Sequence, residues 1–103
     1  MWESRLVGRL SFLDDTPLFD GDCVRFIGVD DGKHVVCGVT TYALKHCTPN
    51  LPQHGLLPAE AFISAFEKLI VDIHRVVRTK YENADFEPEG PIQVMVHRKD
   101  IAP

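Results

Sequence analysis

The sequence lacks the features that mark the more specialised classes of protein. Its three cysteines are too few, and odd in number, for a self-contained disulfide framework, so we expect free thiols and a cytoplasmic location. No apolar stretch approaches the ~20 residues of a membrane span, and the N-terminal apolar segment is too short for a signal peptide. Basic residues are also few: 11 Lys and Arg stand against 15 Asp and Glu, a balance that disfavours broad binding to nucleic acid or anionic membranes.

What remains is the composition of an ordinary globular domain. The chain has 103 residues, of which 45% are hydrophobic and 25% charged, as in average soluble domains. A chain of this length provides one modest core and no second one. We therefore expect a single domain over residues 1–103, with a polar end that frays over residues 98–103.

Residues 23–40 carry the strongest local signal. Two runs rich in β-branched residues flank Asp31-Gly32, and Asp-Gly is typical of the two-residue turn of a β-hairpin because glycine adopts positive φ at no steric cost. This turn sets the pairing of the two strands and therefore which side chains share a face. The face predicted to join the core consists of Val24, Phe26, Val35, Cys37 and Val39.

The opposite face of the hairpin is only partly polar. The candidate interface on this face consists of Arg25, Ile27, Val29, His34 and Val36. Three of these side chains are apolar and β-branched, and exposed groups of this kind often mark a contact surface. Either another segment of the chain, such as the N-terminal one, or a partner subunit covers them.

The remaining elements follow from apolar periodicity and turn residues. We expect a half-buried strand over residues 5–13, a short helix over residues 42–46 capped by Thr40 or Thr41, and a proline-bearing loop over residues 47–58. Apolar residues then recur at steps of three and four, which predicts one long helix from Pro58 to about Asn83. The apolar stripe of this helix consists of Phe62, Phe66, Leu69, Ile73, Val77 and Tyr81.

A last strand follows the turn at residues 88–91. Residues 92–97 alternate, which predicts that Ile92, Val94 and Val96 face the core. The order of elements predicts an α+β fold, in which a small antiparallel sheet containing the hairpin packs on the long helix of the C-terminal half. The short helix completes this arrangement.

Several of these positions together resemble a family of small bacterial proteins known as domain of unknown function fourteen-eighty-eight. The matching positions are mostly core and turn residues between residues 10 and 101: Val24, Phe26, Asp31-Gly32-Lys33, Val36-Cys37, Thr40-Thr41, Ala43-Leu44, Ala65-Phe66, Ile73, Lys80-Tyr81 and Asp100-Ile101. The resemblance implies a compact α+β fold. It brings no catalytic residue, cofactor or substrate.

The titratable residues do not predict a reaction or a cofactor. Cys37, His46, Cys47 and His54 lie close in sequence but lack the paired spacing of a structural zinc site. A thiol nucleophile needs exposure and a lowered pKa, whereas Cys37 belongs to the core face and Cys47 follows a helix C-terminus. His74, Arg75 and Arg78 are better explained by pairing with nearby acids than by an anion site.

Three classes of function are compatible with these observations. We favour a small cytoplasmic, non-enzymatic interaction module that acts as a homodimer or through a protein partner, with no known small-molecule ligand. The first alternative is nucleic-acid binding through a local basic strip of Arg5, Arg9, Arg25 and Lys33. The second is an enzyme whose site has no recognised motif and lies in a crevice that joins His, Asp or Cys groups.

Overall fold

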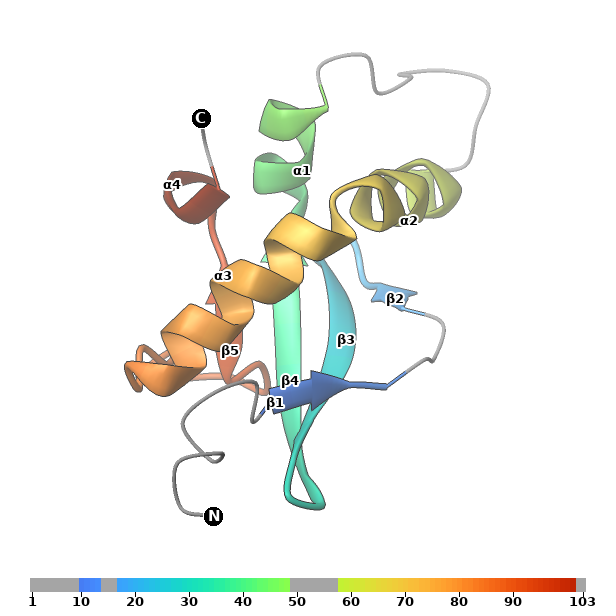
Figure 1. The fold of residues 1–103 in the computed structure, drawn as a ribbon. Coiled ribbons are helices and arrows are strands. Elements are labelled where there is room, and N and C mark those ends of the chain that lie inside the picture. The colour runs from blue at the N-terminus through green and yellow to red at the C-terminus, as the bar shows by residue number, and fades with distance from the viewer. Residues whose placement is uncertain (1–9, 14–16, 49–57, 102–103) are drawn as a thin grey trace.

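The computed structural model describes residues 10–13, 17–48 and 58–101. Its elements in chain order are β1 (Leu10–Phe12), β2 (Leu18–Phe19), β3 (Cys23–Asp30), β4 (Lys33–Thr40), α1 (Thr41–Cys47), α2 (Pro58–Lys68), α3 (Ile70–Glu82), β5 (Val94–Val96) and α4 (Arg98–Ile101). The helix α3 crosses one face of the sheet, while α1, α2 and α4 gather at one end of it (Figure 1). This arrangement confirms the predicted α+β class. No helix within these ranges has both the length and the apolar character that a membrane crossing requires.

The hairpin of β3 and β4 forms in the predicted register. Asp31 and Gly32 both have positive φ, of 53° and 84°, as a primed two-residue turn demands. Phe26 therefore pairs with Cys37, and Val24 with Val39. The predicted core face is buried along its whole length.

The sheet is mixed, whereas the sequence predicted an antiparallel one. Its order is β1-β3-β4-β5, with β2 also paired to β3. All pairs are antiparallel except β4 and β5, which run parallel with Cys37 opposite Val94. The chain leaves β4 at its C-terminal end and passes through α1, α2 and α3 to the opposite end of the sheet, where β4 begins, so β5 runs in the same direction as β4.

The predicted long helix divides at Leu69 into α2 and α3. Leu69 has φ −104° and ψ 11°, outside helical values, and its N–H bonds to the carbonyls of both Ala65 and Phe66. The chain changes direction there (Figure 1). This bend lets α2 pack Phe62 against Phe19 of β2, with ring centroids 5.1 Å apart, while α3 contacts β1 and β5. The apolar periodicity of the sequence continues through Leu69, so the periodicity alone predicted one unbroken helix.

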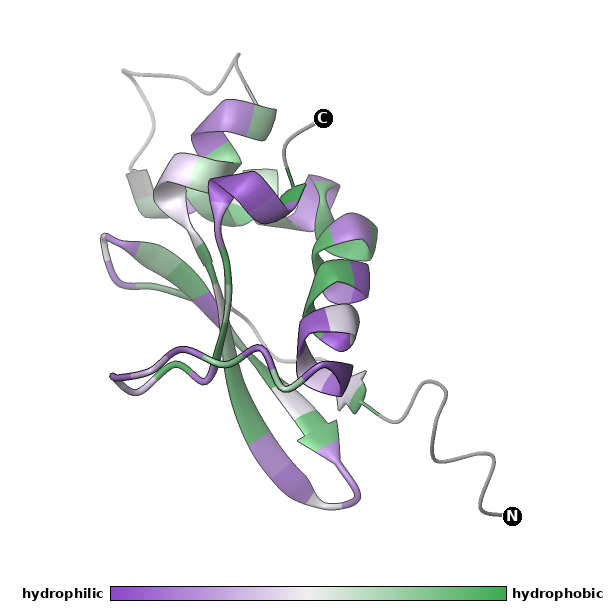
Figure 2. Cartoon of the chain, turned by 90° about the vertical axis from the view of Figure 1, so that its left-hand side faces the viewer, coloured by the Kyte–Doolittle hydropathy of each residue, from purple (hydrophilic) through white to green (hydrophobic). Residues whose placement is uncertain are grey.

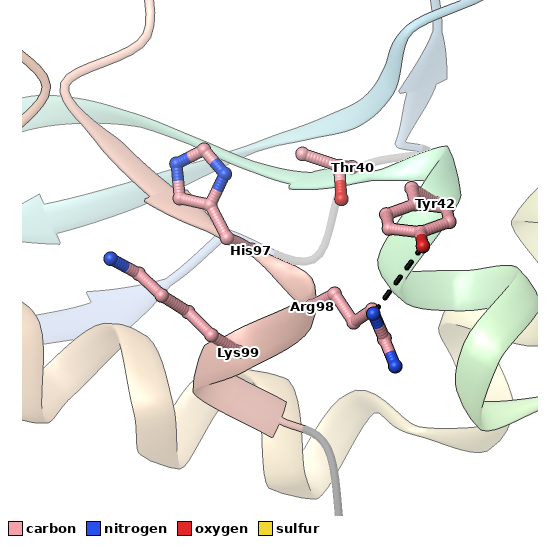
Figure 3. A pocket seen from close by; sticks show the side chains of 5 residues that line it. All are labelled: Thr40, Tyr42, His97, Arg98 and Lys99. Carbon is pink, nitrogen blue, oxygen red and sulfur yellow. Dashed lines mark hydrogen bonds between the residues drawn. The ribbon is translucent and has the colours of Figure 1, made fainter.

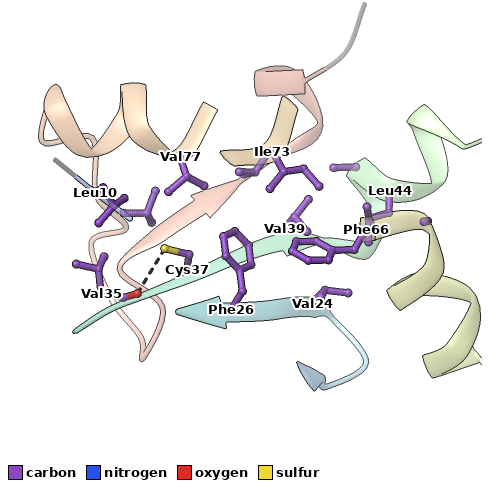
Figure 4. Packing of buried hydrophobic residues seen from close by; sticks show 14 of the residues in the cluster. Leu10, Val24, Phe26, Val35, Cys37, Val39, Leu44, Phe66, Ile73 and Val77 are labelled. Carbon is purple, nitrogen blue, oxygen red and sulfur yellow. Dashed lines mark hydrogen bonds between the residues drawn. The ribbon is translucent and has the colours of Figure 1, made fainter. Parts of the chain in front are cut away.

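The core lies between the sheet and these helices. Phe66 of α2 packs on Phe26 of β3 with ring centroids 5.0 Å apart, and Ile73 and Val77 of α3 face the strands (Figure 4). These three helical residues belong to the predicted apolar stripe, whose inward direction is thereby confirmed. Thr40 caps α1 as predicted, since its hydroxyl oxygen accepts a hydrogen bond from the N–H of Ala43 at 3.0 Å.

The C-terminal end forms a helical turn over residues 98–101, where the sequence predicted fraying. The Oδ2 atom of Asp100 accepts hydrogen bonds from Lys80 Nζ and from the N–H of His97, both at 2.8 Å. Lys80 is only 7% exposed, so this ion pair fastens α4 to α3. Lys80 and Asp100 are both among the residues that carry the family resemblance, and their contact gives that pattern a physical reason.

Candidate functional site: the outer face of the sheet

The face of the sheet that points away from α3, here called the outer face, carries all five residues of the candidate interface. Strand alternation and the pairing register place them in rows: Arg25 with Gly38, Ile27 with Val36, and Val29 with His34. His34 is exposed and the other four candidate residues are half-buried. The structure therefore brings the predicted residues together on one surface.

The chain covers part of this surface itself. A Cβ atom on Gly38 would lie 3.1 Å from Met95 Sδ and 3.3 Å from Ile92 Cδ1, so both side chains lie over Gly38 on the outer face. The prediction that Ile92 faces the core is therefore wrong: β5 begins only at Val94, and its alternation does not extend back to Ile92. Ile92 is 7% exposed. The apolar surface that remains, here called the outer patch, consists of Ile27, Val29, Val36 and Met95.

One end of the outer face is polar and internally paired. Arg25 Nε lies 2.9 Å from Asp20 Oδ2. The backbone N–H groups of Cys23 and Asp22, followed by Arg25, hold the pKa of Asp20 below its usual value. The charge of Arg25 is thus balanced beside the patch, and the face carries no unpaired cation at this position.

The basic strip of the nucleic-acid alternative does not assemble in the described part of the chain. Arg25 points to the outer face, whereas Lys33 shares its strand parity with core residues and pairs with Asp30 at the hairpin tip. The two positions lie five residues apart along the hairpin, which is about 17 Å. Arg5 and Arg9 lie outside the described residues.

The three thiols lie apart from one another and are all free. Burial, and then Asp20, raises the pKa of Cys23 to about 11, and burial raises that of Cys37 to about 12. The pKa of Cys47 is also raised, by burial and by the charge of Asp72. All three are protonated at neutral pH, which disfavours them as nucleophiles.

The suggested zinc ligands do not converge either. Cys37 lies in the core, and Cys47 Sγ donates to the carbonyl of Ile101 at 3.7 Å. His54 lies outside the described residues. Within the ranges that the structure describes, no three His, Cys, Asp or Glu side chains are grouped as metal ligands would be.

His74 and its neighbours on α3 serve the packing of β1. The His74 ring stacks on Phe12 with centroids 3.7 Å apart, and Arg78 Nε donates to the carbonyl of Leu10 at 3.0 Å. Burial, and then the charge of Arg78, lowers the pKa of His74. Arg75 pairs with Asp72 at 2.8 Å, as the sequence indicated.

A feature that sequence reasoning missed lies at the carboxyl ends of β4 and β5. A depression of about 600 Å³ opens there, and the described residues that line it are Thr40, Tyr42, His97, Arg98 and Lys99 (Figure 3). Arg98 Nη1 donates to Tyr42 Oη at 3.3 Å, and His97 Nε2 lies 2.9 Å from Glu87 Oε2. The only signal in the sequence was the basic run at residues 97–99, which resembled an ordinary polar end.

Comparison with known proteins bears on the fold. A family model described as "Protein of unknown function (DUF1488)" matches residues 10–94. The crystal structure of a protein of unknown function from this family, from Shewanella loihica PV-4, is similar with a TM-score of 0.71 and 21% sequence identity. The match covers 87% of this chain and 93% of that one, so the two share a fold. No curated protein matches this chain significantly. The chain belongs to the DUF1488 family, as its core and turn residues indicated.

Proposed function

We propose that the protein is a cytoplasmic, non-enzymatic interaction module that forms a homodimer through the outer patch. One observation carries the proposal: the four apolar side chains of the patch lie together on a sheet face that no helix of the described chain covers. Figure 2 shows α3 on the other side of the sheet. Contiguous apolar surface of this kind is characteristic of contact surfaces.

The charges at the patch favour a second copy as the occupant. Two identical faces meet in a symmetric dimer, so any unbalanced charge on the face would repel itself. Arg25 is balanced by Asp20, and the patch itself is uncharged. The raised pKa values of the three thiols disfavour a cysteine nucleophile.

The size of the face predicts a weak dimer. Strands β3 and β4 have eight residues each, which gives a length of about 27 Å, and three neighbouring strands span about 14 Å. The product is roughly 400 Å² of flat surface, about half of what each partner buries in a standard interface. We therefore expect association in the micromolar range.

Sedimentation velocity from about 5 µM to about 500 µM tests this proposal. We expect the wild type to shift from monomer to dimer over that range, and Val29→Lys to remain monomeric because two buried ammonium groups would face each other. Val71→Lys is the matched control, since Val71 is 75% exposed on α3, away from the patch. It should dimerise like the wild type.

Two results would overturn the homodimer. One is a wild type that stays monomeric at the highest concentration, with nuclear Overhauser contacts between the outer patch and residues 1–9; the chain's own N-terminal segment would then be the cover. The other is a dimer that Val29→Lys leaves unchanged.

A further inference from the structure

The depression beside α1 and α4 is built by segments that lie far apart in the sequence. Val39 of β4 pairs with Val96 of β5, and the two strands run parallel. Thr40 and His97 directly follow this pair, so both strands end at the same place and continue into α1 and α4 (Figure 3). The carboxyl ends of neighbouring parallel strands are a common place for ligands.

The lining of the depression is rich in basic groups in a protein whose net charge is -4. His97, Arg98 and Lys99 line it, and no described residue of the lining carries a carboxylate. Among the described residues, neither Arg98 nor Lys99 takes part in an ion pair. Glu87 contacts His97 beside the depression, and Asp100 pairs with Lys80. Arg98 and Lys99 therefore line the depression with positive charges that no described residue pairs with.

The donors of the depression are held in position before any ligand arrives. The Arg98 guanidinium carbon lies 5.4 Å from the centroid of the Tyr42 ring, and its Nη1 donates to the Tyr42 hydroxyl. One of the five N–H groups of Arg98 is thus used for orientation, and the others remain available. Thr40 accepts a hydrogen bond from Ala43, which leaves its own hydroxyl hydrogen free to donate.

The turn that carries these cations is anchored to the core. The buried Lys80 holds Asp100, and Asp100 also accepts the N–H of His97. Cys47 Sγ donates to the carbonyl of Ile101. These contacts hold the backbone of α4, and the Arg98 side chain adds its own contact with Tyr42.

We propose that this depression binds a phosphate group, either free or carried by a small organic molecule. Arg98 offers a planar fork that matches phosphate oxygens, and Lys99 supplies a second positive charge. Thr40 and Tyr42 add hydroxyl donors at the rim. The volume lies within the ~300–1,000 Å³ of small-molecule sites, so it also accommodates an organic group attached to the phosphate. Thr40 and His97 continue the rows of Gly38 and Met95, so the depression borders the outer patch, but it shares no residue with the patch and its proposed ligand does not require a dimer.

Amide chemical-shift titration of the full chain at constant ionic strength tests the proposal, with inorganic phosphate, glycerol 3-phosphate and glycerol as probes. We expect saturable shifts confined to residues 40–42 and 97–99 with both phosphates and none with glycerol. Tighter binding of glycerol 3-phosphate identifies an organic phosphate as the ligand, whereas equal affinities identify free phosphate.

Two substitutions make the test specific. Arg98→Gln should raise the Kd by about tenfold through loss of the charged fork, with unchanged spectra beyond α1 and α4 because the contacts of Asp100 with Lys80 and of Cys47 with Ile101 remain. Arg75→Gln removes an exposed arginine that pairs with Asp72 on α3, and should leave the Kd unchanged. The proposal would be overturned by shifts that spread over all basic surface residues without saturation. It would also be overturned if the two variants lost affinity for phosphate equally.

Discussion

Replacing Asp100 by alanine should reveal how strongly the C-terminal turn is tied to the core. Lys80 Nζ lies 2.8 Å from Asp100 Oδ2, and the lysine is 7% exposed. Loss of one partner of a buried ion pair costs about 3–5 kcal/mol because a charge is left without compensation. Here Asp85 remains 3.8 Å from the ammonium group and the Asp100 side chain is 18% exposed, which reduces the cost. We therefore expect Asp100→Ala to lower the free energy of unfolding by about 2–3 kcal/mol.

Urea unfolding followed by circular dichroism at pH 7 measures this loss. With a slope of about 1.5 kcal/mol per molar urea, the midpoint should fall by about 1–2 M. Lys80→Met combined with Asp100→Asn is the control, since two neutral side chains of similar shape leave no buried charge. The double variant should lie within about 1 kcal/mol of the wild type. The reasoning would be refuted if Asp100→Ala lowered the free energy of unfolding by less than about 1 kcal/mol. It would also be refuted if the loss in the double variant equalled the sum of the losses in the two single variants.

The same pair predicts an acid limb in the stability profile. Burial raises the pKa of Asp100, but the hydrogen bonds from Lys80 and from the N–H of His97 outweigh it and hold the pKa below its usual value. The stabilisation is therefore complete above the unfolded value of about 3.9 and is lost as the pH falls through the lower folded value. The gap in free energy of unfolding between the wild type and Asp100→Asn should close below about pH 4.

Three further predictions concern the core and the titratable side chains. Phe66→Ala should lower the free energy of unfolding by about 3–5 kcal/mol, because the ring is 3% exposed; a loss below about 1 kcal/mol in urea unfolding would contradict its placement. The lowered pKa of His74 means that the folded state favours the neutral ring, so stability should fall as the pH drops below about 6.5. The urea midpoints at pH 7.5 and pH 5.5 should differ less in His74→Leu than in the wild type. An equal difference in the two proteins would exclude His74 as the source of this pH dependence. Native iodoacetamide labelling with peptide mass mapping should modify Cys47 before Cys23 or Cys37, which are both buried; the reverse order would contradict the thiol environments.

Local chemistry made the hairpin predictable from the sequence. Asp31 and Gly32 specify a primed turn, and the turn then determines which side chains share each face. The same logic located the candidate interface, because strand parity is a local property. It also placed Phe66 and Ile73 on the buried side of their helices.

The features that the sequence did not reveal depend on contacts between distant segments. The bend at Leu69 follows from the packing of α2 and α3 against different strands, while the apolar repeat continues through it. The order at residues 98–101 requires Lys80, which lies 20 residues before Asp100 in the sequence. The phosphate site needs the ends of β4 and β5 side by side, and nothing near Tyr42 or Arg98 in the sequence indicates that they meet.

The parallel pairing of β5 with β4 also has a consequence for the time course of folding. Among the described elements, β5 and α4 are synthesised last, yet β5 lies beside a strand made much earlier. Pairing between segments so distant in sequence closes slowly, since the intervening helices must dock first. Until then the edge of β4 has unpaired backbone groups, and such an edge readily joins strands of other chains. During synthesis, the period of greatest aggregation risk should therefore run from emergence of the hairpin until residues 94–96 reach it.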